Sequence, residues 1–163
     1  MELTHFDEAG NARMVDVSEK AVTARTAVAE GYISVNAEIY ERIKAGDYEK
    51  KAMFWRWLNW RRLWAPRKTS DLIPLCHPLM LSKVAVICEL DEKRRAVRIE
   101  ATVKTSGQTG VEMEALTAVQ VGLLAVFDMC KAIDKSMVMG PVYLVEKAGG
   151  KSGHFVNNNR PAK

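Results

Sequence analysis

Two stretches of alternating apolar and polar residues, joined by a polar turn, constrain the fold of this chain most strongly. The first runs from Lys83 to Leu90, and the turn after it reads DEKRR over 91–95. In the second, the apolar positions are Val97, Ile99, Ala101 and Val103. A period of two places alternate side chains on opposite faces of a strand. The sequence therefore predicts an antiparallel hairpin with one buried face.

The rest of the chain adds a strand and two helices before this hairpin, and a helix and a strand after it. We predict a strand over 23–35, a short helix over 37–43, a second helix over 52–64, a long apolar helix over 112–133 and a last strand over 142–145. The order β-α-β-β-α-β is typical of a ferredoxin-like α+β sandwich, in which an antiparallel sheet carries helices packed on one face. We expect one domain over 1–163, with residues 154–163 as a loose tail.

Composition limits the class of protein. With 163 residues, 48% apolar and 27% charged, the chain is typical of a globular domain with its own core. No uninterrupted apolar run approaches the ~18 residues of a membrane helix, and Met1–His5 does not resemble a signal peptide. Three widely spaced cysteines favour a reducing cytoplasm over a disulfide framework. The net charge of +4 favours an anionic small molecule or weak nucleic-acid contact.

The segment TSDLIPLCHPL, residues 69–79, is the first candidate for a binding loop. Its two prolines exclude an interior strand or helix, so we expect an irregular loop that presents Cys76 and His77. A structural histidine is one interpretation, and an imidazole that hydrogen-bonds a ligand is the other. Because no CxxC or HxxxH spacing accompanies them, we predict no metal site.

The long helix carries charged residues of two kinds. Glu114 lies at its start, where the helix dipole favours a carboxylate. Asp128 and Lys131 are three residues apart and therefore share a face. They are interpreted either as a solvated surface pair or as a proton-transfer pair.

Near the C-terminus, GGKSG over 149–153 invites comparison with a phosphate-binding loop. The glycine that a P-loop requires five positions before Gly150 is replaced by Val145. A basic glycine nest for phosphate and a plain turn both remain open.

Four long motifs together give the chain a family resemblance. They are MVDV (14–17), SDLIPLCHPL (70–79), GVEMEALTA (110–118) and DMCKA (128–132). With them, the sequence resembles the MoaC family, the cyclic pyranopterin monophosphate synthases of molybdenum cofactor biosynthesis, from Leu3 to Gly153. The resemblance implies conversion of 3′,8-cyclo-7,8-dihydro-GTP, made by an upstream radical GTP cyclase, to cyclic pyranopterin monophosphate with release of pyrophosphate. It also implies a ferredoxin-like fold and a homo-hexamer, a trimer of dimers, with sites at subunit interfaces.

The same resemblance assigns expected roles to individual residues. The acid–base groups are Lys51, Asp128 and Lys131, and the cations for the triphosphate are Lys51, Arg67, Lys68 and Lys131. The residues expected to line the pterin part are Leu75, Cys76, His77, Glu112, Met113 and Glu114. No redox cofactor is expected, whereas Mg²⁺ with the triphosphate is left open. No membrane or nucleic-acid partner is expected.

Residues 52–66, AMFWRWLNWRRLWAP, depart from the family pattern and contain all four tryptophans of the chain. An amphipathic helix is one interpretation, and a nucleic-acid or membrane-surface patch is another. A local frameshift is the third: read one base earlier, residues 51–69 become KGDVLAVAQLAASMGAKKT, which fits the family. The patch supports an alternative function as a basic binding module, and a genuine segment would also fit a catalytically impaired homologue.

Overall fold

The computed structural model describes residues 4–45 and 63–161. The strands are β1 (Thr23–Ser34), β2 (Leu81–Asp91), β3 (Ala96–Gly107), β4 (Met139–Ala148) and β5 (Phe155–Val156). The helices are α1 (Ala37–Ala45), the 3₁₀ helix η1 (Ala65–Lys68), α3 (Thr69–Leu72) and α4 (Glu112–Cys130). Each strand and helix predicted within these ranges is present, with bounds that differ by a few residues.

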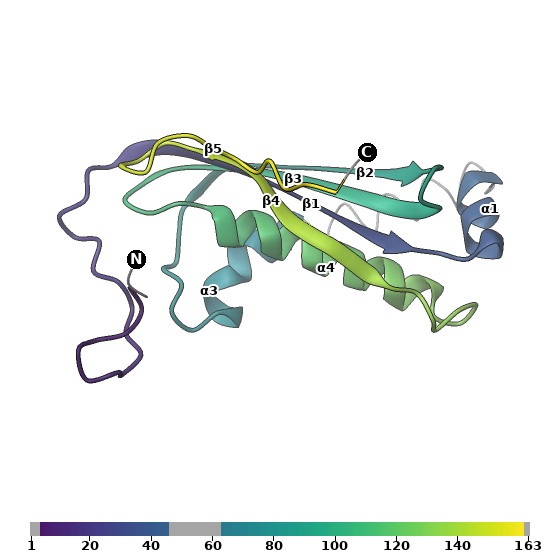
Figure 1. The fold of residues 1–163 in the computed structure, drawn as a ribbon, viewed down its shortest axis with the longest axis horizontal. Helices are drawn as coiled ribbons and strands as arrows, with labels where there is room; N and C mark the ends of the chain where they lie inside the picture. Colours follow the sequence, from purple (N-terminus) through teal and green to yellow (C-terminus); the bar gives the residue numbers. More distant parts are fainter. Residues whose placement is uncertain (1–3, 46–62, 162–163) are drawn as a thin grey trace.

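The strands form one sheet in the order β2-β3-β1-β4-β5, and every neighbouring pair is antiparallel. The first four follow the ferredoxin-like order, so the predicted α+β fold is confirmed. Figure 1 shows α4 and α3 below the sheet and α1 at one end of it. The N-terminal arm, residues 4–22, extends away from the sheet at the other end (Figure 1).

Helix α4 supplies most of the layer that covers the sheet. It contacts β1, β3 and β4, and glycines allow a close approach on both sides. A Cβ on Gly31 of β1 would lie 2.7 Å from Val119 Cγ1, and one on Gly122 of α4 would lie 2.7 Å from Ile99 Cδ1. In the described part of the chain, only α4 is long and apolar enough to cross a membrane by length and composition. Its burial against the sheet is that of a core helix.

Two expectations are corrected. Residues 69–79 are not entirely irregular, because Thr69–Leu72 forms one helical turn before the loop begins. The two prolines follow this turn, so neither interrupts it. The tail after Gly153 is not loose at its start either. Phe155 and Val156 pair with β4, and Asn157 donates its backbone N–H to Val145 O at 2.9 Å.

The atypical segment 52–66 lies mostly outside the described residues, so the helix predicted for 52–64 and the three interpretations of the segment stay predictions. The structure describes this segment only from Leu63 onward. Leu63 and Trp64 are helical and exposed. Ala65 and Pro66 follow in η1 and are buried.

Candidate functional site

Two adjoining cavities lie at the N-terminal end of α4. The larger has a volume of about 1050 Å³ and the smaller about 270 Å³. Four residues line both: Lys20, Thr109, Gly110 and Glu112. Their shared walls make one continuous candidate site with two compartments.

The smaller cavity brings together all six residues expected to contact the pterin part of a ligand. They are Leu75, Cys76, His77, Glu112, Met113 and Glu114. The loop after α3 supplies the first three, and the first turn of α4 supplies the others. The structure therefore gathers this predicted set around a single space, although their roles remain predictions.

The N-terminal arm closes the smaller cavity with a residue that the sequence did not suggest. His5 lines the cavity, and its Nδ1 lies 3.3 Å from Arg13 O. Because a carbonyl oxygen only accepts hydrogen bonds, this contact is a hydrogen bond in the tautomer that carries the proton on Nδ1. In the neutral imidazole, Nε2 is then left as an acceptor for a ligand donor.

Burial alters the acidity of two groups in this cavity. Burial raises the pKa of the Cys76 thiol, and the negative charge of Glu114 raises it further. Burial also raises the pKa of Glu114 from 4.5 to about 7. A hydrogen bond from its own backbone N–H opposes this rise, and the neighbouring Glu112 carboxylate adds to it.

The larger cavity is built around Arg25, near the start of β1. Its guanidinium donates from Nε to Gly107 O and from Nη2 to Gln108 O, both at 2.9 Å. These two carbonyls fix the plane of the guanidinium without neutralising its charge. No ion pair of Arg25 is present in the described parts of the chain. Arg25 is therefore positioned to meet an anion.

The glycine-rich loop between β4 and β5 packs directly against this arginine. Gly149 and Gly150 have φ of +96° and +72°, which favour glycine. A Cβ on Gly150 would lie 2.0 Å from Arg25 Nη1, and one on Gly149 would lie 2.1 Å from Ala24 O. The glycines are thus required by the close approach of the loop to β1. Lys151 and Ser152 of the same loop line the cavity.

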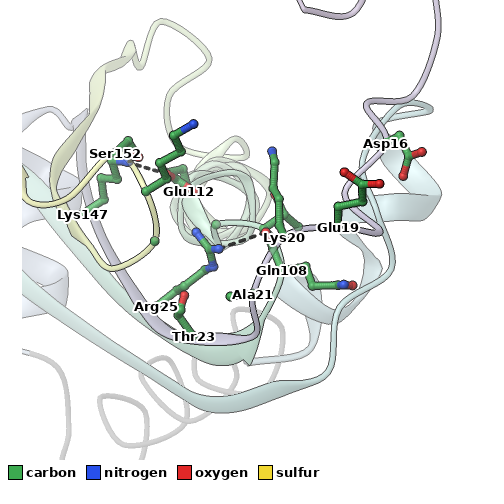
Figure 2. A pocket seen from close by; sticks show the side chains of 14 residues that line it. Asp16, Glu19, Lys20, Ala21, Thr23, Arg25, Gln108, Glu112, Lys147 and Ser152 are labelled. Atoms are coloured by element: carbon green, nitrogen blue, oxygen red, sulfur yellow. Dashed lines mark hydrogen bonds and ion pairs between the residues drawn. The ribbon is translucent and has the colours of Figure 1, made fainter.

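Lys147 and Glu112 connect the two compartments. Lys147 Nζ lies 3.9 Å from Glu112 Oε1 and also contacts Ser152 Oγ. In Figure 2 these groups lie on the same side as Arg25, whereas Asp16 and Glu19 lie on the opposite side of the cavity. The hydroxyl of Thr23, also in the wall, is buried and has no hydrogen-bond partner among the described residues. This side offers cations, as a phosphate group requires.

The remaining predicted residues do not line either cavity. Asp128, in the last turn of α4, and Lys131, its C-cap, form an ion pair of 2.7 Å, each side chain 55% exposed. Sixteen residues separate Glu112 from Asp128, about 24 Å along a helix. Lys68 is paired with Asp71 at 3.0 Å and Arg67 is exposed. Lys51 lies outside the described residues.

Sequence reasoning missed the main cations of the larger cavity, Lys20, Arg25 and Lys147. Each is an ordinary basic residue in or beside a strand. Their convergence depends on the pairing of β1 with β3 and β4. The only local signal was the glycine cluster at 149–153, for which a phosphate nest was one of two open interpretations. In the described residues, no group of three or more potential metal ligands occurs.

Fold and cavities together define a small α+β protein with a candidate site for an anionic ligand. The model of the MoaC family matches residues 14–150. Curated proteins named cyclic pyranopterin monophosphate synthase are similar over nearly the whole chain. The protein from Heliobacterium modesticaldum is 52% identical over 154 residues, covering 94% of this chain and 96% of the relative. The one from Roseiflexus is 52% identical over 157 residues, covering 96% of this chain and 99% of the relative. The one from Geobacillus kaustophilus is 53% identical over 154 residues, covering 93% of this chain and 94% of the relative. The chain belongs to the MoaC family.

Proposed function

We propose that this chain is a cyclic pyranopterin monophosphate synthase, a lyase of molybdenum cofactor biosynthesis. It converts 3′,8-cyclo-7,8-dihydro-GTP to cyclic pyranopterin monophosphate and releases pyrophosphate. The observation that carries the proposal is identity above 50% to synthases over more than nine-tenths of the chain. The upstream radical GTP cyclase is the expected source of the substrate. The reaction needs no redox cofactor, and Mg²⁺ would enter with the triphosphate if it takes part.

The two compartments match the two parts of this substrate. A ring system fits the smaller cavity, between the Cys76–His77 loop and the first turn of α4. The triphosphate extends into the larger cavity, toward Arg25, Lys147 and the glycine-rich loop. Charge-assisted hydrogen bonds from such cations are stronger than neutral ones, and they stabilise the charge of the departing pyrophosphate.

Lys20 offers the cleanest test of this placement, because it lines both cavities and has no ion pair in the described ranges. We expect Lys20→Ala to raise KM for the cyclised dihydro-GTP by about 10- to 100-fold, the value of one charge-assisted contact. The change in kcat should be smaller. Lys93→Ala, in the exposed β2–β3 turn, is the matched control and should leave KM unchanged. Steady-state kinetics at fixed ionic strength measures both, and equal KM values for the two variants would contradict the placement.

The acid–base pair requires a second copy of the chain. Asp128 lies about 24 Å along α4 from Glu112, and Lys131 lies further still, too far to reach a ligand in the same subunit's cavities. We therefore place them at the cavity of a neighbouring subunit, as the hexameric assembly implied by the family resemblance would allow. Lys51, Arg67 and Lys68 are assigned to the same shared site, with Arg67 and Lys68 as further cations for the triphosphate.

The alternative function, a basic module for nucleic acid or membrane surfaces, depends on residues 52–66. It gives no role to either cavity, so the synthase is favoured. A catalytically impaired homologue would keep the cavities but lack turnover. Intact-mass measurement with peptide mapping over residues 50–69 separates a genuine Trp/Arg segment from the frameshifted one.

A further inference from the structure

We propose that Glu114 is a catalytic residue of this site, one that holds and returns a proton at the ring of the bound substrate. The proposal rests on the proposed function, because it assigns a role in that reaction. It concerns a group that the resemblance places only as part of the cavity lining.

The position of Glu114 is unusual for a carboxylate. The residue is 4% exposed, yet it lines the smaller cavity from the first turn of α4. In the described part of the chain no cation forms an ion pair with it, and the one hydrogen bond assigned to its carboxylate comes from its own backbone N–H. A buried carboxylate that is structural is normally paired. The group is therefore held available for a ligand.

The groups that face this carboxylate also favour a proton on it. Apolar side chains from three segments form much of the wall: Val15, Val17, Leu75, Leu79 and Met113. The titratable or charged groups of the same cavity are His5, Lys20, Cys76, His77 and Glu112. Of these, Glu112 opposes ionisation of Glu114. With a pKa of about 7, both protonation states are populated near neutral pH. General acid–base groups work best in that range.

The proton transfers proposed for Glu114 balance over one reaction cycle. When a carbon–nitrogen bond of the ring breaks, the neutral acid gives its proton to the departing nitrogen, forming an N–H bond and leaving a carboxylate. When a nitrogen attacks carbon to form the new ring, the carboxylate takes the proton that this nitrogen loses. The carboxyl group ends as it began, and no oxidant or reductant is involved.

Glu114→Gln tests the role, because glutamine keeps the size and the hydrogen-bonding ends but cannot exchange this proton. We expect kcat to fall by about 100-fold or more, while KM changes by less than about threefold. The pH dependence of kcat near pH 7 should disappear from the residual activity. The matched control is Glu38→Gln, at an exposed glutamate of α1, which should retain the parental kcat and pH profile.

A second measurement needs no substrate. The carboxyl carbon of Glu114, observed by NMR in the ligand-free protein, should titrate with a midpoint of about 7. A midpoint near 4.5, or a Glu114→Gln variant with the parental kcat and pH profile, overturns the proposal. Wild-type protein that does not turn over the cyclised dihydro-GTP overturns the proposed function itself, and this role with it.

Discussion

We expect Lys131→Ala to lower kcat for the cyclised dihydro-GTP by about 1,000-fold, since general acid–base groups typically contribute 10²- to 10⁴-fold. The fold should survive, because Lys131 and Asp128 form an exposed pair at the end of α4. Such pairs contribute only about 0.2–1 kcal/mol to the free energy of unfolding. Lys135→Ala, four residues further on and also exposed, is the control and should keep the parental rate. A parental kcat in Lys131→Ala would remove this lysine from the mechanism.

The same variant shows whether the site is shared between subunits. His77→Ala alters the cavity, whereas Lys131→Ala alters the pair at the far end of α4. We expect each variant to be inactive alone. Co-assembly of the two should restore roughly a quarter of the sites, because each restored site takes its cavity from one subunit and its lysine from another. No recovery in verified mixed oligomers would show that each site is built from a single chain.

A charged network lies on the face of the sheet opposite α4, and we expect its loss to destabilise the protein strongly. Arg98 of β3 donates from Nε to Glu30 Oε2 at 2.7 Å and from Nη1 to Glu89 Oε1 at 2.8 Å. It also contacts Glu100. The side chain of Glu30 is 7% exposed and accepts further hydrogen bonds from Tyr32 and Tyr143.

We expect Arg98→Ala to lower the free energy of unfolding by about 3–5 kcal/mol, because it leaves a buried carboxylate without its cation. The melting temperature should fall by roughly 10 °C for a chain of this size. Arg42→Ala removes an exposed pair with Glu38 on α1 and should cost less than about 0.5 kcal/mol. Thermal and urea unfolding of both variants measures the difference. Equal losses in the two variants would contradict the importance of the buried network.

The loss in Arg98→Ala should also depend on pH. Burial opposes ionisation of Glu30, but hydrogen bonds from Tyr143, Tyr32 and Arg98 outweigh it and hold the pKa of this carboxyl below its ordinary 4.5. A lowered pKa in the folded chain stabilises the protein above the unfolded value, and this stabilisation is lost as pH falls through the folded value. The difference between wild type and Arg98→Ala should therefore be largest near pH 7 and shrink below pH 4.5.

The sequence predicted the parts of the fold that depend on local periodicity. The alternation of apolar and polar residues on either side of the turn 91–95 identified β2 and β3. The apolar run from Glu112 identified α4. Strand β5 was missed because two residues carry no periodic signal and pair only after the glycine-rich loop reverses the chain. The helical turn Thr69–Leu72 was missed because the prolines that follow it dominated the interpretation.

The candidate site, too, could be predicted from the sequence only in part. The family resemblance, carried by contiguous motifs, named six residues from two segments that line the smaller cavity. The larger cavity could not be predicted, because Arg25 and Lys147 meet only through strand pairing. The predicted helix over 112–133, by contrast, already placed Glu112 and Asp128 toward opposite ends of one helix. That separation follows from the length of α4 as an unbroken helix.

The most direct test of the synthase function is whether the purified wild-type protein turns over 3′,8-cyclo-7,8-dihydro-GTP. We expect equal amounts of cyclic pyranopterin monophosphate and pyrophosphate to form, and both to be lost in Lys131→Ala. If no product forms under conditions in which the Geobacillus kaustophilus synthase is active, the proposed function is contradicted.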